Sequence, residues 1–215
     1  MCADDREPGP PADVERARLH VILFEPEIAA NAGAIGRTCV AAGAALWLVR
    51  PLGFHLDDRH RRRAGLDYWP HLPLRLVDGL DEVIAHFGPE RLWWFSTRAD
   101  RPYTTAPFCE GDALLLGPES RGLPAPRLQE ASRLGRALRI PIRPEVRSLN
   151  LANAAAIAVY EALRQLELRA GPGRPDALNC ATPRRSSRRG VASIIARATW
   201  LRARSGRPPG RGRRS

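Results

Sequence analysis

The amino-acid sequence predicts an α/β fold, with a mostly parallel β-sheet covered by helices on both faces. Short apolar runs recur along the chain, and such runs are typical of strands buried on both faces. Segments with the helical spacing of apolar residues lie between these runs, and this alternation is typical of parallel sheets. The chain has 215 residues, of which 44% are hydrophobic. This is enough for one domain with a buried core.

The first part of the chain predicts a strand, a helix and a second strand. The compact apolar run at residues 19–24 predicts the first strand. Asn31 is expected as the N-cap of a helix over residues 32–42, because its side chain can accept a hydrogen bond from the first helical turn. Gly43 is expected to end this helix, since glycine adopts the left-handed conformation of a C-terminal cap. The apolar run at residues 45–49 predicts the next strand.

The middle of the chain is less regular. Residues 51–73 are basic and rich in turn-forming residues, with one short helical turn expected over residues 58–64. A short strand at residues 74–77 precedes a helix over residues 78–87, whose first residue is an aspartate that can act as N-cap. The run Leu-Trp-Trp-Phe-Ser at residues 92–96 predicts a further strand.

The last part of the domain continues the alternation. Residues 113–116 and 137–142 predict two more strands, with a helix over residues 126–134 between them. Apolar residues then recur at helical spacing over residues 150–168, which predicts a long amphipathic final helix.

Composition and charge indicate three parts of the chain. We expect a disordered leader at residues 1–17, one domain at residues 18–170 and an Arg-rich, mostly disordered tail at residues 171–215. The tail holds 12 of the 34 basic residues and a single acid, so it accounts for the net charge of +11 and leaves residues 1–170 neutral. An amphipathic stretch at residues 191–202 fits a solvated extension, an RNA-binding aid or a contact with another partner.

The cysteines and histidines provide no pattern for a metal centre. The four cysteines are widely spaced and form no C-x-x-C pair, which favours a reduced intracellular compartment. The five histidines show no H-E-x-x-H or Cys-flanked spacing, so no metal is expected. The chain shows neither a secretory leader nor an apolar run of about 18 residues. We therefore expect a cytoplasmic protein with no membrane partner.

Two segments place polar residues directly after an apolar strand, at residues 113–124 and 139–154. Ligands of parallel sheets bind in the crevice beyond the carboxyl ends of the strands. We therefore expect both segments to line one shared pocket.

The polar residues near these strand ends also allow structural interpretations. Arg37 fits a surface position on an amphipathic helix. Glu119 fits a local ion pair with Arg121, and Ser148 fits the N-cap of the last helix. No single residue decides between the two interpretations, but the combination of motifs does.

That combination resembles a known family. Three segments look like the three motifs of the SpoU class of SPOUT methyltransferases: Asn-x-Gly-x-Ile-x-Arg-x-Cys at residues 31–39, Leu-Gly-Pro-Glu-Ser-Arg-Gly-Leu-Pro at 116–124, and Ile-Pro-Ile-x-Pro-x-x-Arg-Ser-Leu-Asn-Leu-Ala-Asn-Ala at 140–154. Phe-Glu-Pro-Glu-Ile at residues 24–28 and Arg-Arg-Ala-Gly-Leu-Asp-Tyr at 62–68 look most like the small subfamily that methylates the tRNA wobble nucleotide.

The resemblance implies a trefoil knot near the carboxyl end of the domain and a homodimer packed through the knot and the final helix. It implies transfer of a methyl group from the cofactor S-adenosyl-L-methionine to a ribose 2′-hydroxyl of RNA. Carried over position by position, the cofactor-binding residues are Phe95, Gly117, Ile140, Ser148 and Leu149. The residues implied in catalysis are Arg37, Glu119 and Asn150.

A free guanidinium keeps its protons, so we expect Arg37 to grip the phosphate or ribose and align the hydroxyl. The identity of the general base stays open. The function implied is 2′-O-methylation of cytidine or uridine at the wobble position of the tRNA anticodon loop. Two alternatives are a 2′-O-methyltransferase of another RNA site, in rRNA or tRNA, and a catalytically inert RNA-binding relative.

Overall fold

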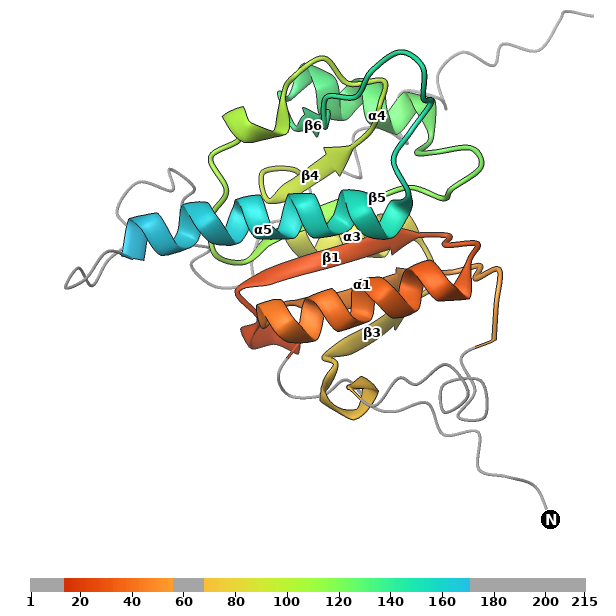
Figure 1. Cartoon of the computed structure of the whole chain (residues 1–215), viewed down its shortest axis with the longest axis vertical. Coiled ribbons are helices and arrows are strands. Elements are labelled where there is room, and N and C mark those ends of the chain that lie inside the picture. The colour runs from red at the N-terminus through yellow and green to blue at the C-terminus, as the bar shows by residue number, and fades with distance from the viewer. Residues whose placement is uncertain (1–13, 56–67, 171–215) are drawn as a thin grey trace, which may run out of the picture. The chain divides into compact units, whose positions relative to one another are not determined.

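The computed structural model describes residues 14–55 and 68–170. Six strands form one sheet in which every neighbouring pair is parallel (Figure 1). The order across the sheet is β3-β2-β1-β5-β4-β6. The prediction of a parallel sheet is therefore confirmed. The strands are β1 (Leu19–Phe24), β2 (Ala45–Val49), β3 (Leu74–Val77), β4 (Leu92–Phe95), β5 (Asp112–Leu116) and β6 (Ala137–Leu138).

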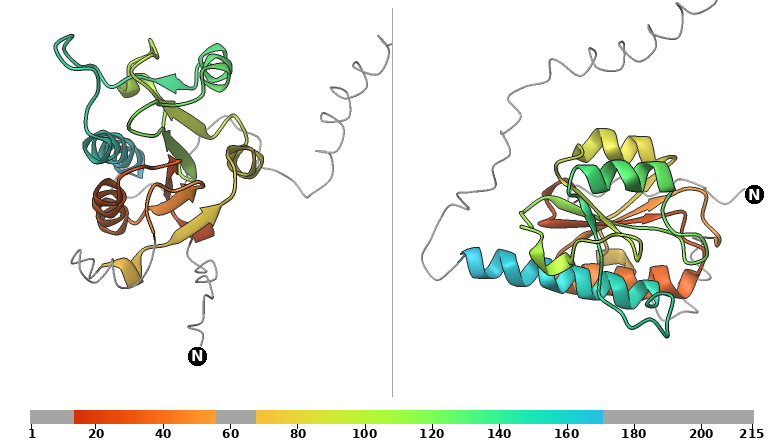
Figure 2. Two further views of the ribbon diagram at one scale, coloured as in Figure 1. Left: turned by 90° about the vertical axis from the view of Figure 1, so that its right-hand side faces the viewer. Right: turned by 90° about the horizontal axis from the view of Figure 1, so that it is seen from above.

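Helices cover both faces of this sheet (Figure 2). α1 (Ala29–Ala42) and α5 (Leu151–Ala170) pack on one face, whereas α3 (Leu80–Phe87) and α4 (Ala125–Arg133) pack on the other. Every residue of β1 is buried, because its alternate side chains enter the two different cores. This double coverage explains why the strands are continuous apolar runs in the sequence. Three short 3-10 helices complete the described elements: η1 (Val14–Arg16), η2 (Trp69–His71) and η3 (Tyr103–Thr105).

α1 and α5 pack against each other through small side chains. Ala155 and Ala158 of α5 are fully buried in the same core as Ala32 of α1. At these two positions the final helix, through which the resemblance implies packing between subunits, is thus used inside the chain.

The first helix begins earlier than predicted. α1 starts at Ala29 with Ile28 in the N-cap position, so the prediction that Asn31 caps the helix is wrong. Asn31 lies inside the first turn, where its side chain is free to make a tertiary contact. The prediction for Gly43 is confirmed, because this residue ends α1 in the left-handed conformation with a φ of 63°.

The cap predicted for the next helix is also wrong. Gly79, not Asp78, occupies the N-cap position of α3. Asp78 instead accepts a 2.9 Å hydrogen bond from Arg50. An aspartate just before a helix therefore serves a contact with a neighbouring loop.

The last strand is shorter than the predicted residues 137–142. β6 ends at Leu138, and Arg139 adds only an isolated bridge to Pro102. β6 lies at the edge of the sheet, and Pro141 has no N–H group to extend the ladder. Ile140 and Ile142 are used instead in the wall of a cavity.

The described chain begins within the predicted leader. Val14 is only 1% exposed and packs in the core on the α3 side of the sheet, so the end of residues 1–17 is folded. The helical turn predicted at residues 58–64, the motif at 62–68 except for Tyr68, and the tail at 171–215 lie outside the described residues.

The cysteines differ in state. Cys39 is a free thiol with no exposed surface, and burial raises its pKa. Cys109 is disulfide-bonded.

None of the helices in residues 14–55 and 68–170 combines the length and the apolar character that crossing a membrane requires. The same part of the chain has no group of three or more His, Cys, Asp or Glu side chains placed to hold a metal ion.

Candidate functional site

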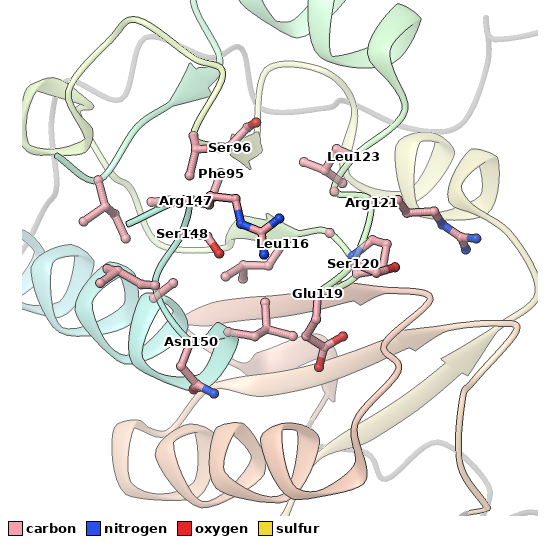
Figure 3. Close-up of a pocket in the computed structure, with 18 of the residues that line it drawn as sticks. Phe95, Ser96, Leu116, Glu119, Ser120, Arg121, Leu123, Arg147, Ser148 and Asn150 are labelled. Atoms are coloured by element: carbon pink, nitrogen blue, oxygen red, sulfur yellow. The ribbon is translucent and has the colours of Figure 1, made fainter. Parts of the chain in front are cut away.

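A cavity of about 740 Å³ opens where β4, β5 and the segment after β6 end (Figure 3). The sequence predicted one shared pocket at these strand ends, and the two polar segments do meet there. All five residues predicted to contact the cofactor line it: Phe95, Gly117, Ile140, Ser148 and Leu149. Glu119 and Asn150 also line it. The wall combines apolar side chains with a few polar groups, as is usual in pockets for small organic ligands.

The loop after β5 is folded tightly back on itself. A Cβ atom on Gly117 would lie 2.7 Å from the backbone nitrogen of Leu123, closer than real Cβ contacts come. Gly122 has a φ of 69°, a conformation that favours glycine. Arg98 braces the same loop by donating a 2.8 Å hydrogen bond to the carbonyl of Leu123. These two glycines therefore set the shape of one wall of the cavity.

Glu119 is held by two N–H donors, one on each carboxylate oxygen. Its Oε1 accepts a 2.8 Å hydrogen bond from Nδ2 of Asn31, and its Oε2 accepts a 3.0 Å hydrogen bond from the backbone N–H of Glu27. The local ion pair between Glu119 and Arg121 that the sequence allowed is not formed. Arg121 pairs instead with Glu25 and points away from the cavity (Figure 3).

Asn150 extends this arrangement. Its Nδ2 donates a 2.9 Å hydrogen bond to Oδ1 of Asn31, while its Oδ1 accepts hydrogen bonds from the N–H groups of Ala152 (2.9 Å) and Asn153 (3.3 Å). Because the oxygen faces the start of α5, the amide nitrogen must face Asn31. One of its two N–H bonds is used there, which leaves the other for a ligand.

We call Glu119, Asn31 and Asn150 the polar triad. It joins the start of α1, the loop after β5 and the start of α5, which are the three motif segments. Sequence reasoning placed Glu119 and Asn150 in the site but missed Asn31, because asparagine before a helix was interpreted as a cap. The signal that identifies Asn31 is its position as the first residue of the motif at residues 31–39.

Ser148 does not cap the last helix. Asn150 provides that cap through its side-chain oxygen. Ser148 is exposed and lies in the cavity wall (Figure 3). The structural interpretation of Ser148 is therefore wrong, and its hydroxyl is available to the cavity.

A second set of contacts fixes the loop after β5 to the turn after β1. The carboxylate of Glu27 accepts hydrogen bonds from the backbone N–H (3.0 Å) and the hydroxyl (2.5 Å) of Ser120. Gly53 supports the turn from behind, since a Cβ there would lie 2.6 Å from the carbonyl oxygen of Glu27. We call the contacts of Glu25 with Arg121 and of Glu27 with Ser120 the loop clamp. Sequence reasoning did not find it.

Arg37 lies apart from these groups. The residues lining the cavity, within the part of the chain that the structure describes, do not include it. It is exposed on α1, with its guanidinium 5.0 Å from the centre of the Tyr68 ring. Gly36 beside it allows close packing, because a Cβ there would lie 3.1 Å from the side chain of Leu72. Of the three residues implied in catalysis, Glu119 and Asn150 thus lie in the cavity wall, whereas Arg37 lies farther along α1, the helix that carries Asn31.

Comparison with known proteins identifies similar chains. The model of the SpoU rRNA Methylase family matches residues 18–160. The tRNA (cytidine(34)-2′-O)-methyltransferase of Saccharophagus degradans is 46% identical over 148 residues, which cover 69% of this chain and 96% of that protein.

Two solved structures are similar as well. One, described as "Structural insights into the 2-OH methylation of C/U34 on tRNA", is 48% identical with a TM-score of 0.62 and covers 69% of this chain and 95% of its own. The SpoU methyltransferase AviRb of Streptomyces viridochromogenes, solved in complex with the cofactor AdoMet, is 26% identical with a TM-score of 0.61. The match covers 74% of this chain and 63% of that one.

Proposed function

Since this chain belongs to the SpoU rRNA methylase family, we propose that it is an S-adenosylmethionine-dependent tRNA 2′-O-methyltransferase. Its target would be the ribose of the wobble nucleotide, cytidine or uridine, in the anticodon loop. The observation that carries the proposal is that the three motif segments meet in one cavity through the polar triad. The near-complete coverage of the wobble methyltransferase from S. degradans supports the choice of RNA site.

The cavity fits a methyl donor of this kind. Leu116, Ile140 and Leu149 offer an apolar wall for an adenine ring, and Ser148 offers a hydroxyl for a polar group. A volume of about 740 Å³ lies in the usual range for pockets that bind such ligands. We propose that backbone groups at Phe95, Gly117 and Ile140 hold the donor. When bound, it supplies an electrophilic methyl carbon on a sulfonium.

The transfer forms a bond between the methyl carbon and the ribose O2′ and breaks the bond between carbon and sulfur. The hydroxyl proton would pass to solvent water, and the sulfur would become a neutral thioether. We propose that the free N–H of Asn150 binds the ribose or its phosphate, and that Glu119 fixes Asn31 and through it Asn150. Both carboxylate oxygens of Glu119 already accept N–H groups, which favours a holding role over proton abstraction.

We propose that Arg37 grips the RNA backbone outside the cavity. It is exposed, and it lies on the helix whose first turn carries Asn31. A guanidinium matches the geometry of a phosphate, and fixing the ribose beside the methyl group can supply roughly 7–11 kcal/mol of the barrier.

We further propose that the segments after β4, β5 and β6 form a trefoil knot and that two copies of the chain assemble as a cytoplasmic homodimer. The convergence of those three segments on one cavity supports the knot. Light scattering coupled to size-exclusion chromatography tests the dimer, and a monomeric mass at micromolar concentration would contradict it.

Mapping ribose methylation in tRNA tests the function. Mass spectrometry of tRNA from cells with and without the gene should show loss of the 2′-O-methyl group at the wobble nucleotide alone. Complementation with the wild-type gene should restore it, whereas the Asn150→Ala gene should not. Loss at a different RNA position would instead favour the alternative of another methylation site.

The inert alternative is tested separately with the purified protein. Isothermal titration with S-adenosylmethionine should show binding. The absence of binding at high micromolar donor would favour an RNA-binding relative without transfer.

A further inference from the structure

The segment between β6 and α5 carries three arginines that face solvent beside the cavity. Arg139, Arg143 and Arg147 are all exposed. A turn closed by the N–H of Val146 and the carbonyl of Arg143, at 3.3 Å, lies between the second and third of them. Arg147 also lines the cavity and reaches toward its middle (Figure 3).

These arginines differ from most others in the described residues. Arg18, Arg127 and Arg164 each pair with a carboxylate at 2.5 to 3.0 Å. For Arg139, Arg143 and Arg147, no ion pair or side-chain hydrogen bond occurs with any residue that the structure describes. Their positive charges are therefore not neutralised by a carboxylate within this part of the chain.

The local charge is also unbalanced. Residues 139–150 contain these three arginines and one acid, Glu145, whereas residues 1–170 as a whole contain as many acidic as basic side chains. An exposed cluster of unpaired guanidinium groups, with one acid beside it, attracts a polyanion, and each guanidinium can form two parallel hydrogen bonds to a phosphate.

We propose that Arg139, Arg143 and Arg147 form a phosphate-binding surface that holds the RNA backbone on both sides of the nucleotide entering the cavity. The inference rests on the proposed function, since it assigns the RNA contact of the same site. The place of the cluster supports it: the arginines follow β6 and precede Asn150, so a strand held there has its ribose next to the polar triad.

The test compares the triple variant Arg139→Ala/Arg143→Ala/Arg147→Ala with the control Arg133→Ala. Arg133 is also exposed and unpaired among the described residues, but it lies at the end of α4 and does not line the cavity. Binding of unfractionated tRNA is measured by fluorescence anisotropy from about 50 to about 300 mM KCl, a range over which phosphate contacts weaken strongly.

The triple variant should bind tRNA at least about tenfold more weakly at low salt. The slope of log affinity against log salt should become shallower by about 2, because each lost phosphate contact contributes about 0.7 to 0.9. The triple Arg→Lys variant should keep the slope and lose part of the affinity, since lysine keeps the charge without the planar fork. The control should match wild type.

Two results would overturn the inference: a triple variant with wild-type affinity and slope, or a triple variant with normal tRNA binding and a tenfold loss of S-adenosylhomocysteine affinity. The second would assign Arg147 to the methyl donor. Because the readout is RNA binding, it stays decisive even if wild-type protein transfers no methyl group, the result that would refute the proposed function.

Discussion

At the scale of single residues, Gly117 is a position in the cavity wall where the neighbouring backbone leaves no room for a side chain. A Cβ there would meet the backbone of Leu123 at 2.7 Å, and backbone cannot rotate away as a flexible side chain can. We expect Gly117→Ala to open the loop after β5 and to weaken S-adenosylhomocysteine binding at least about tenfold, at 1.4 kcal/mol per tenfold. Isothermal titration measures this loss.

The matched control for this substitution is Gly79→Ala. No atom lies within 4 Å of a Cβ at Gly79, and its backbone is extended. This variant should keep wild-type donor affinity. Equal affinities for the two variants would show that the tight loop does not shape the donor site.

Glu119 is the residue of the polar triad that needs two acceptor oxygens, one for each N–H donor. Glu119→Gln replaces one acceptor oxygen with an N–H donor, which must then face the N–H of either Asn31 or Glu27. A fully buried donor left without an acceptor costs about 1–3 kcal/mol, and this partly buried contact should cost less. We expect kcat/KM for tRNA to fall about tenfold or more while S-adenosylhomocysteine affinity changes less than about threefold. Steady-state kinetics at wild-type level would refute the holding role.

At the scale of elements, the loop clamp joins the turn after β1 to the loop after β5. Glu27 accepts two hydrogen bonds from Ser120, and bonds to a charged group contribute about 1.5–3 kcal/mol. We expect Glu27→Gln and Ser120→Ala each to raise the KM for the methyl donor severalfold. Together they should cost less than the sum of the two effects, because both weaken the same contact.

A double-mutant cycle on donor affinity measures this coupling. Ser132→Ala, at an exposed position in the last turn of α4, is the control that should combine additively with Glu27→Gln. Additive behaviour of Glu27 and Ser120 themselves would mean that the clamp does not act as a unit.

The elements differ in how far the sequence predicts them. β1, β2 and β3 were predicted to the residue. For β1 and β2 the reason is that a run buried on both faces is visible as continuous apolar sequence. The end of β6 was predicted wrongly, because Ile140 and Ile142 line the cavity and do not belong to the strand. Composition alone does not distinguish the two uses.

The site shows the same division. Its location follows from the rule that strand ends in parallel sheets bind ligands, and its residues follow from the motifs. The pairing of Glu27 with Ser120 joins residues 93 positions apart, which no local pattern indicates. The N-cap preference of asparagine led to the wrong interpretation of Asn31, because the tertiary contact with Glu119 overrides local propensity.

At the scale of the whole molecule, the two faces of the sheet serve different purposes. The polar triad and the cavity lie at the carboxyl ends of the strands, near α1 and α5. The opposite core contains a cluster of aromatic rings around His20. His20 is 4% exposed, and its Nδ1 accepts a 3.2 Å hydrogen bond from the indole N–H of Trp47. This bond requires a neutral imidazole.

Burial, together with a smaller effect of the neighbouring His86, lowers the pKa of His20 to about 4. The unfolded chain, with a pKa of 6.5, therefore binds more protons between pH 6.5 and 4, so stability falls as the pH falls through this window. From pH 7.5 to 5.5 we expect a loss of about 1.3 kcal/mol in the free energy of unfolding from this residue alone. Urea unfolding at the two pH values measures it.

The His20→Gln variant is the control. It should be less stable than wild type at pH 7.5 but lose less free energy of unfolding on acidification. The same loss in both proteins would show that His20 is not the group responsible. Asp112, whose pKa burial raises, acts in the opposite sense at lower pH, which is why the comparison stops at 5.5.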